Sequence, residues 1–156
     1  MTKKSLILFM GVLLLAALTT AGAAVSANSS PTSSSSSVSP IQHLEGKGWI
    51  LTSFVTKNRH FTVLPHTKID ASFSGGTVTG SAGCNRYFAH YRIFRNTIRI
   101  QPVGSTLMYC APKGVMTQEA TYLGLLQRMT TYTINANKLR MLDRTGHNGL
   151  MFYRQS

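Results

Sequence analysis

Hydrophobic and polar residues alternate along most of the chain after residue 41, a pattern typical of β-strands with one buried face. The clearest case lies around residue 71, where Ile69, Ala71 and Phe73 alternate with polar neighbours. Gly75-Gly76 follows directly and can supply the positive φ angles that a tight turn requires. These residues predict a β-hairpin that continues into Thr77-Val78-Thr79.

The same alternation predicts further strands on both sides of this hairpin. Short polar segments such as Lys57-Asn58-Arg59, Arg95-Asn96 and Asn135-Ala136-Asn137 separate neighbouring strands as turns do. The remaining strands are predicted over residues 49–54, 61–64, 91–93, 98–100, 132–134, 139–141 and 152–153.

One segment has the period of a helix. From Tyr122 to Met129, hydrophobic residues recur at i, i+3, i+4 and i+7, which forms one apolar stripe. We expect Thr117 to cap the helix, Glu119 to lie near the positive end of its dipole and Arg128 near the negative end. The predicted fold class is α+β, predominantly antiparallel β: a curled sheet or partly open small barrel, with the helix packed where closure is incomplete.

The N-terminal residues predict export. Lys3 and Lys4 precede an apolar run from Leu6 to Leu18, which is short for a membrane span of about 20 residues. Residues 1–27 are therefore interpreted as a signal peptide cleaved after Ala27, with an uncleaved N-terminal anchor as the alternative. Residues 28–40 are predicted to be a Ser-rich flexible linker, and residues 41–156 have the size of one domain.

The charge of the chain is strongly unbalanced. Its 16 Lys and Arg residues face only 4 Asp and Glu residues, a formal net charge of +12. Loss of Lys3 and Lys4 with the signal peptide removes two of these charges and leaves about +10 on the exported domain. Such a surface attracts anionic polymers and anionic lipid head groups, and we expect no specific nucleic acid as the partner of an exported protein.

Gly83-Cys84-Asn85 and Cys110 contain both cysteines of the chain. Two cysteines in an exported domain favour one structural disulfide, which constrains the unfolded chain by about 3 to 4 kcal/mol for a loop of this size. The alternatives are two buried free thiols or a catalytic cysteine. A nucleophile would have to stay reduced and would need a base beside it.

Gly83 and Asn85 flank the first cysteine, and both residue types tolerate left-handed backbone angles. One interpretation is a sharp bend or bulge that directs Cys84 inward. The other is an anion-binding nest of backbone N–H groups.

Four arginines form a candidate anion-binding strip, interleaved with aromatic residues. Charge and aromatic stacking together are typical of surfaces that bind acidic polymers or single-stranded nucleic acid. The alternative is an amphipathic hairpin whose aromatic residues face the core while the arginines face solvent. The arginines are Arg86, Arg92, Arg95 and Arg99, and the aromatic residues are Tyr87, Phe88, Tyr91 and Phe94.

No catalytic, cofactor-binding or metal-binding residues are predicted. The histidines lack a paired metal spacing, and the common hydrolase and phosphate-loop motifs are missing. Glu119 is interpreted as a helix-terminal residue and Asp70 as part of a strand surface. A hydrolase with an unrecognised site would require Cys84 to be free and reactive.

With these elements in order, the domain resembles the META/HslJ family of small envelope domains. The resemblance is carried by Trp49, Val78-Thr79-Gly80, Gly83-Cys84-Asn85-Arg86, Tyr91, Thr106-Leu107-Met108-Tyr109-Cys110, Glu119 and Leu139-Arg140-Met141-Leu142. It implies a secreted or envelope-attached domain without enzymatic activity, linked in different lineages to stress response, drug tolerance or motility. It implies no ligand. This chain lacks a lipid-attachment cysteine near its predicted cleavage site, and its arginine content is high.

The sequence thus predicts a non-enzymatic binding protein of the cell envelope, without a cofactor, whose partner is an envelope component or an anionic polymer. One alternative is a module dedicated to polyanions, either acidic envelope polymers or nucleic acid. Another is a barrel that holds a lipid acyl chain. A membrane surface is a further candidate partner, because of the basic charge.

Overall fold

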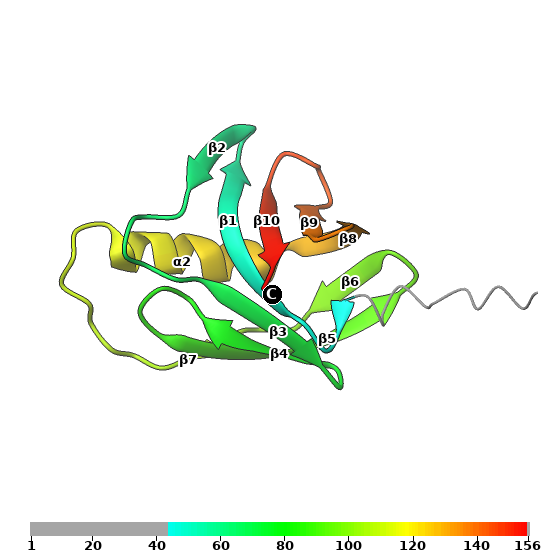
Figure 1. Cartoon of the computed structure of the whole chain (residues 1–156), viewed down its shortest axis with the longest axis horizontal. Coiled ribbons are helices and arrows are strands. Elements are labelled where there is room, and N and C mark those ends of the chain that lie inside the picture. Colours follow the sequence, from blue (N-terminus) through cyan, green and yellow to red (C-terminus); the bar gives the residue numbers. More distant parts are fainter. Residues whose placement is uncertain (1–43, 156) are drawn as a thin grey trace, which may run out of the picture. The chain divides into compact units, whose positions relative to one another are not determined.

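A computed structural model describes residues 44–155 (Figure 1). The predicted signal peptide, residues 1–27, and the predicted linker, residues 28–40, lie outside the described residues. Within the described part, no helix is long and apolar enough to cross a membrane.

Antiparallel strands and one helix make up the described residues. Eight strands close into a barrel in the order β10-β9-β8-β6-β5-β4-β3-β1, and β1 pairs again with β10. Two short strands lie outside this ring, with β2 paired to β1 and β7 paired to β5. The elements are β1 (Gly48–Thr56), β2 (Arg59–Thr62), β3 (Asp70–Ser74), β4 (Thr77–Ser81), β5 (Arg86–Phe94), β6 (Thr97–Ile100), β7 (Gly104–Ser105), α2 (Val115–Leu126), β8 (Met129–Asn135), β9 (Lys138–Asp143) and β10 (Gly149–Arg154).

The predicted fold class and the predicted hairpins are confirmed. Closure depends on the nine-residue strand β1, which pairs with β10, β3 and β2. The junction of β6 with β8 is much shorter, since its register contains the single residue pair Thr97 and Thr131. The Tyr132 amide also donates to the Asn96 carbonyl oxygen there, at 3.0 Å. The barrel is therefore closed, and the β6–β8 junction is its least paired seam.

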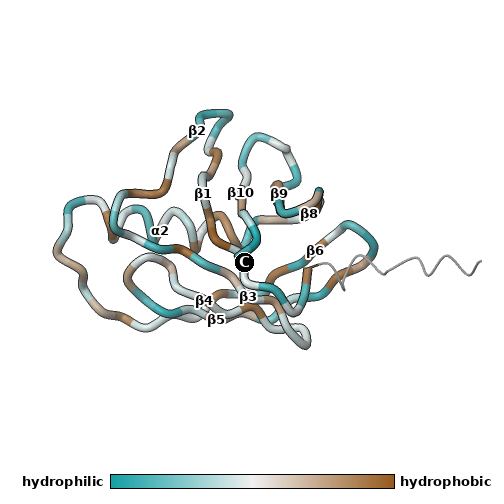
Figure 2. The backbone as a smooth tube through the Cα atoms, in the orientation of Figure 1, coloured by the Kyte–Doolittle hydropathy of each residue, from teal (hydrophilic) through white to brown (hydrophobic). Residues whose placement is uncertain are grey.

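Side chains at alternating strand positions are buried in the barrel. Figure 2 shows hydrophobic and hydrophilic residues mixed along the strands. Trp49, Phe73 and Phe152 are buried in the core, and Tyr122 of α2 is also fully buried. The Tyr122 ring contacts the rings of Tyr87 on β5 and Phe152 on β10. The helix therefore packs against two strands on opposite sides of the strand order, and Tyr122, Leu125 and Leu126 of the predicted apolar stripe are buried.

The ends of the helix differ from the prediction. The helix begins at Val115 with Gly114 as its N-cap, in the left-handed conformation at φ 88°, and no side chain caps it. Thr117 is therefore inside the helix rather than at its cap. Arg128 and Met129 lie beyond the last helical residue, because the chain turns there to enter β8.

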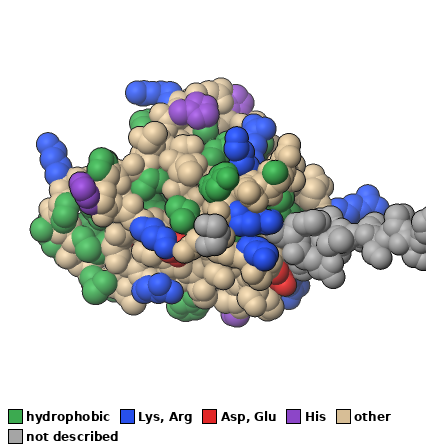
Figure 3. Space-filling model, in the orientation of Figure 1, with side chains coloured by type: hydrophobic (Ala, Val, Ile, Leu, Met, Phe, Trp, Pro, Cys, Tyr) green, Lys and Arg blue, Asp and Glu red, His purple; other side chains and the backbone are tan. Residues whose placement is uncertain are grey.

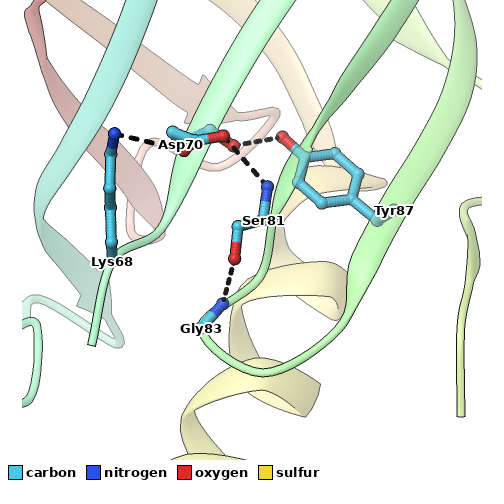
Figure 4. Close-up of polar contacts among 5 residues, drawn as sticks. All are labelled: Lys68, Asp70, Ser81, Gly83 and Tyr87. Atoms are coloured by element: carbon cyan, nitrogen blue, oxygen red, sulfur yellow. Dashed lines mark hydrogen bonds and ion pairs between the residues drawn. The ribbon is translucent and has the colours of Figure 1, made fainter. Parts of the chain in front are cut away.

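A partly buried polar cluster joins the β3–β4 hairpin to β5 (Figure 4), and Tyr122 links it to α2. The Asp70 carboxylate accepts from the Ser81 amide at 3.0 Å and lies 3.7 Å from the Lys68 ammonium. The Tyr87 hydroxyl donates to the Asp70 carbonyl oxygen at 2.9 Å and bonds the Tyr122 hydroxyl at 2.7 Å. Burial raises the pKa of both tyrosines, so both phenols stay protonated.

The close approach of β4 to β3 at this cluster predicts a specific sensitivity at Gly80. A Cβ there would lie 2.0 Å from the Asp70 carbonyl oxygen. We expect Gly80→Ala to lower the free energy of unfolding by about 2 kcal/mol or more, because the backbone that anchors Tyr87 must shift. Gly124→Ala is the control, since nothing lies within 4 Å of its Cβ position in α2. Urea unfolding that shows equal effects of the two substitutions would contradict this packing.

Candidate functional site

The turn between β4 and β5 encloses a carboxylate. Gly83 has a φ of 106°, which turns two successive backbone N–H groups toward the side chain of Glu119 on α2. The Glu119 Oε2 atom accepts from the Cys84 amide at 3.2 Å and from the Asn85 amide at 2.7 Å. Glu119 is only 6% exposed and Asn85 only 1%. The turn therefore joins the end of β4 to the helix.

The Asn85 side chain extends this network to the loop after β7. Its Nδ2 group donates to the Glu119 carboxylate at 2.7 Å and to the Met108 carbonyl oxygen at 3.0 Å. Its Oδ1 atom accepts from the Met108 amide and from the Thr106 hydroxyl, both at 2.7 Å. The carboxamide thus uses both donors and both acceptor sites, and it fixes the backbone of the loop at Met108 from both sides.

A disulfide between Cys84 and Cys110 holds the same loop at its far end, with the Cα atoms 6.0 Å apart. The structure thus brings together the two cysteines that the sequence predicts as a pair. The described residues contain no free cysteine. Such a pair is compatible with an extracytoplasmic location.

These contacts combine the two interpretations of the Gly83-Cys84-Asn85 turn. The turn is a sharp bend at Gly83, and its N–H groups do bind an anion, but the anion is the protein's own Glu119 carboxylate. The expectation that Cys84 is the inward residue was wrong, since the buried side chain is that of Asn85. The interpretation of Glu119 as a helix-terminal residue was also wrong, because α2 carries no acidic residue in its first turn.

The aromatic residues of β5 divide between its two faces. Tyr87 and Tyr91 face the core, as the amphipathic alternative predicts. Phe88 and Phe94 are 57% and 72% exposed, because they have the same parity along the strand as the arginines. The outer face of β5 is therefore a basic strip with exposed aromatic rings.

Part of this strip borders a groove of about 850 Å³ beside the β6–β8 seam. Arg92 on β5 lies directly opposite Arg99 on β6, and both line the groove together with Arg128, which follows α2. Phe94 also lines it, and the Arg95 guanidinium lies over the Phe94 ring at 5.4 Å from its centroid. The groove thus gathers Arg92 and Arg99 from the predicted set and adds Arg128, which sequence reasoning had assigned to the helix end.

Arg86 and Arg95 lie elsewhere on the strip. Arg86 is at the first position of β5, and its backbone carbonyl oxygen accepts from the Thr106 amide at 3.0 Å. Six residues of extended strand separate it from Arg92, a distance of about 20 Å. Arg95 lies in the β5–β6 turn with a φ of 56°. The four predicted arginines therefore do not form a single site.

The carboxylates of the described chain are engaged away from the groove. Glu45 accepts from the Tyr91 hydroxyl, and Glu119 is enclosed by the Asn85 turn. Asp143 accepts from Thr145 and Asn148; burial opposes ionisation, but these hydrogen bonds outweigh it and lower the pKa of Asp143. Lys68 with Asp70 is the one ion pair found in the part of the chain that the structure describes. Figure 3 shows Lys and Arg spread over the visible face, with few Asp or Glu side chains.

The other sequence candidates do not come together. Among the described residues, no group of three or more His, Cys, Asp or Glu side chains could hold a metal ion. Asp70 belongs to the structural cluster at Ser81 and Tyr87 rather than to an open strand surface. Large side chains such as Trp49, Phe73 and Tyr122 occupy the core, which disfavours the acyl-chain alternative.

We term the hydrogen bonds of Glu119 with Cys84 and Asn85 the clamp. The fold and this clamp define a class of small closed β-barrels with one packed helix and a loop held by a disulfide. The META domain matches residues 42–156, and the chain belongs to this family. The family resemblance expected from the sequence is thereby confirmed.

Solved structures show the same fold at low sequence identity. A protein from Burkholderia xenovorans, solved by NMR, has a TM-score of 0.63 and 22% identity over 74% of this chain and 86% of that one. A DUF4847 family protein from Bacteroides vulgatus has a TM-score of 0.53 and 14% identity over 74% of this chain and 98% of that one. A search of curated proteins found no match.

The enclosed carboxylate makes Glu119→Gln a sharp test of the clamp. The Gln amide would place a second donor against the Asn85 Nδ2 group, which now donates at 2.7 Å. We expect a loss of about 2 kcal/mol in the free energy of unfolding, measured by urea denaturation. Glu45→Gln removes the same charge but keeps an acceptor for Tyr91, and should cost less than half as much. Equal losses would show that Glu119 acts only through its charge.

Proposed function

We propose that this protein is an exported, non-enzymatic binding protein that holds acidic polymers of the cell envelope in the groove beside the β6–β8 seam. The observation that carries the proposal is the convergence of Arg92, Arg99 and Arg128 on one groove whose lining includes no carboxylate. A stress-tolerance role, which the family resemblance implies, would follow from retention of such polymers at the cell surface.

The arrangement of the arginines favours a ligand that brings its own negative charge. Like charges directly opposite each other on neighbouring strands are destabilising, and Arg92 faces Arg99 in this way. No carboxylate of the protein relieves this repulsion at the groove. A bound phosphate, sulfate or carboxylate group would relieve it, and a guanidinium can bind such groups through two parallel hydrogen bonds.

The remaining lining suits a polymer with sugar or polyol units. Thr97, Gln127 and Thr130 supply hydroxyl and amide groups along the groove. Phe94 presents an exposed ring against which the apolar face of a sugar could stack. Charge combined with such contacts suits repeating acidic units, and it requires no catalytic group.

Support for a binding role also comes from the two cysteines and Glu119, which are engaged within the protein. Both cysteines are joined in the disulfide, and the Glu119 carboxylate is enclosed by three donors. The predicted export agrees with this disulfide. Acidic envelope polymers are the anions that a protein in that location meets.

The test compares two triple variants of equal charge. Changing Arg92, Arg99 and Arg128 to Gln should weaken binding to polygalacturonate and to polyphosphate. The slope of log K against log salt should also decrease by about two, because three fewer counterions are displaced. The control changes Arg59, Arg140 and Arg144, exposed residues outside the groove, to Gln. The same loss in both variants, or tighter binding of single-stranded nucleic acid than of either polymer, would contradict the proposal.

A further inference from the structure

The loop between β7 and α2 exposes three consecutive large apolar side chains. Leu107 is 96% exposed, Met108 56% and Tyr109 82%. In Figure 1 this loop projects at the left of the barrel, and Figure 3 shows hydrophobic side chains gathered at that end. Exposed apolar clusters of this kind commonly mark an interaction surface.

The loop cannot withdraw these side chains by folding back on the barrel. Asn85 binds both the amide and the carbonyl group of Met108, at 2.7 and 3.0 Å. The disulfide to Cys84 fixes Cys110, two residues further along. The side chains of Leu107 and Tyr109 are thus held outward by a buried network whose other end is Glu119.

Basic residues flank these three apolar side chains. Arg86 lies beside it, since its carbonyl oxygen accepts from the Thr106 amide, and Lys113 follows three residues after Cys110. Both side chains are exposed. The nearest carboxylate along this network, Glu119, is buried and faces inward. The loop therefore presents apolar side chains next to exposed basic residues.

We propose that the loop from Leu107 to Tyr109, which we term the apolar tip, inserts into the surface of an anionic phospholipid bilayer. A projecting apolar tip enters the headgroup layer without needing a matching pocket, and Tyr is favoured at the level of the head groups. Arg86 and Lys113 would then lie against the lipid phosphates, where each basic residue strengthens binding about fivefold. This site is separate from the arginine groove, and it adds membrane attachment to the proposed polymer binding.

The fluorescence of a tryptophan placed in the apolar tip of the full chain tests the insertion. Tyr109→Trp places a probe in the apolar tip, and Tyr153→Trp places a matched probe on β10, where Tyr153 is 48% exposed. In the closed strand order β10 is four strands from β5 in either direction, so the control probe lies on the opposite side of the barrel. Trp49 is buried and forms the same background in both variants.

With vesicles of phosphatidylglycerol and phosphatidylcholine, we expect the Tyr109→Trp emission to shift to shorter wavelength and to be quenched by doxyl-labelled lipid. The Tyr153→Trp emission should change little. Adding Arg86→Gln and Lys113→Gln to the Tyr109→Trp variant should lower the insertion equilibrium about fivefold for each charge.

Attachment through another part of the chain would not require the Tyr109 side chain to enter the lipid, so the contrast between the probes reports on the tip itself. Equal quenching of both probes would overturn the proposal. An unchanged Tyr109→Trp spectrum, whether or not the chain binds the vesicles, would also overturn it.

Discussion

The hydrogen bonds between the Glu119 carboxylate and the turn at Gly83 to Asn85 are the interaction on which the rest of this structure depends. A carboxylate that is 6% exposed loses most of its hydration, and it is stable only when donors replace the lost water. Two backbone N–H groups and the Asn85 amide replace it, without a cation. This requirement fixes the position of α2 relative to the start of β5.

The same network separates residues with structural roles from those suited to recognition. Gly83, Asn85 and Glu119 belong to the motifs that carry the family resemblance, and each of them is used internally. The arginines of the groove and the side chains of the apolar tip are exposed instead. Because β5 begins beside the tip and ends at the groove, the rigid barrel supports both surfaces. Among META domains, we therefore expect the residues of the groove and of the apolar tip to differ while those of the clamp stay the same.

Local features and the single cysteine pair were predictable from the sequence, but the other long-range contacts were not. The hairpin turn at Gly75-Gly76 and the helical stripe around Tyr122 each depend on neighbouring residues, so the pattern was sufficient for both. Strand parity could also have placed Phe88 and Phe94 outward, because they alternate with Tyr87 and Tyr91. The predicted start of the helix was wrong because the N-cap is Gly114 in a left-handed conformation, and no side chain caps the helix. The sequence pattern therefore contained no capping residue at the true start.

The hydrogen bonds between Glu119 and Asn85 could not be predicted from neighbouring residues, since 34 positions separate the two. Its only trace in the sequence is an acidic residue on the buried face of an amphipathic helix. Arg128 joined Arg92 and Arg99 for a similar reason, because the β6–β8 neighbourhood is set by closure of the barrel rather than by adjacent residues. Such contacts require the complete strand order.

Amide hydrogen exchange of the native protein tests the clamp most directly. Met108 lies in a loop without regular structure and its side chain is 56% exposed, yet its amide donates to the buried Asn85 side chain. We predict that the amides of Cys84, Asn85 and Met108 exchange as slowly as those in the centre of β5. Exchange of these three amides at the rate of an unstructured peptide would contradict the account.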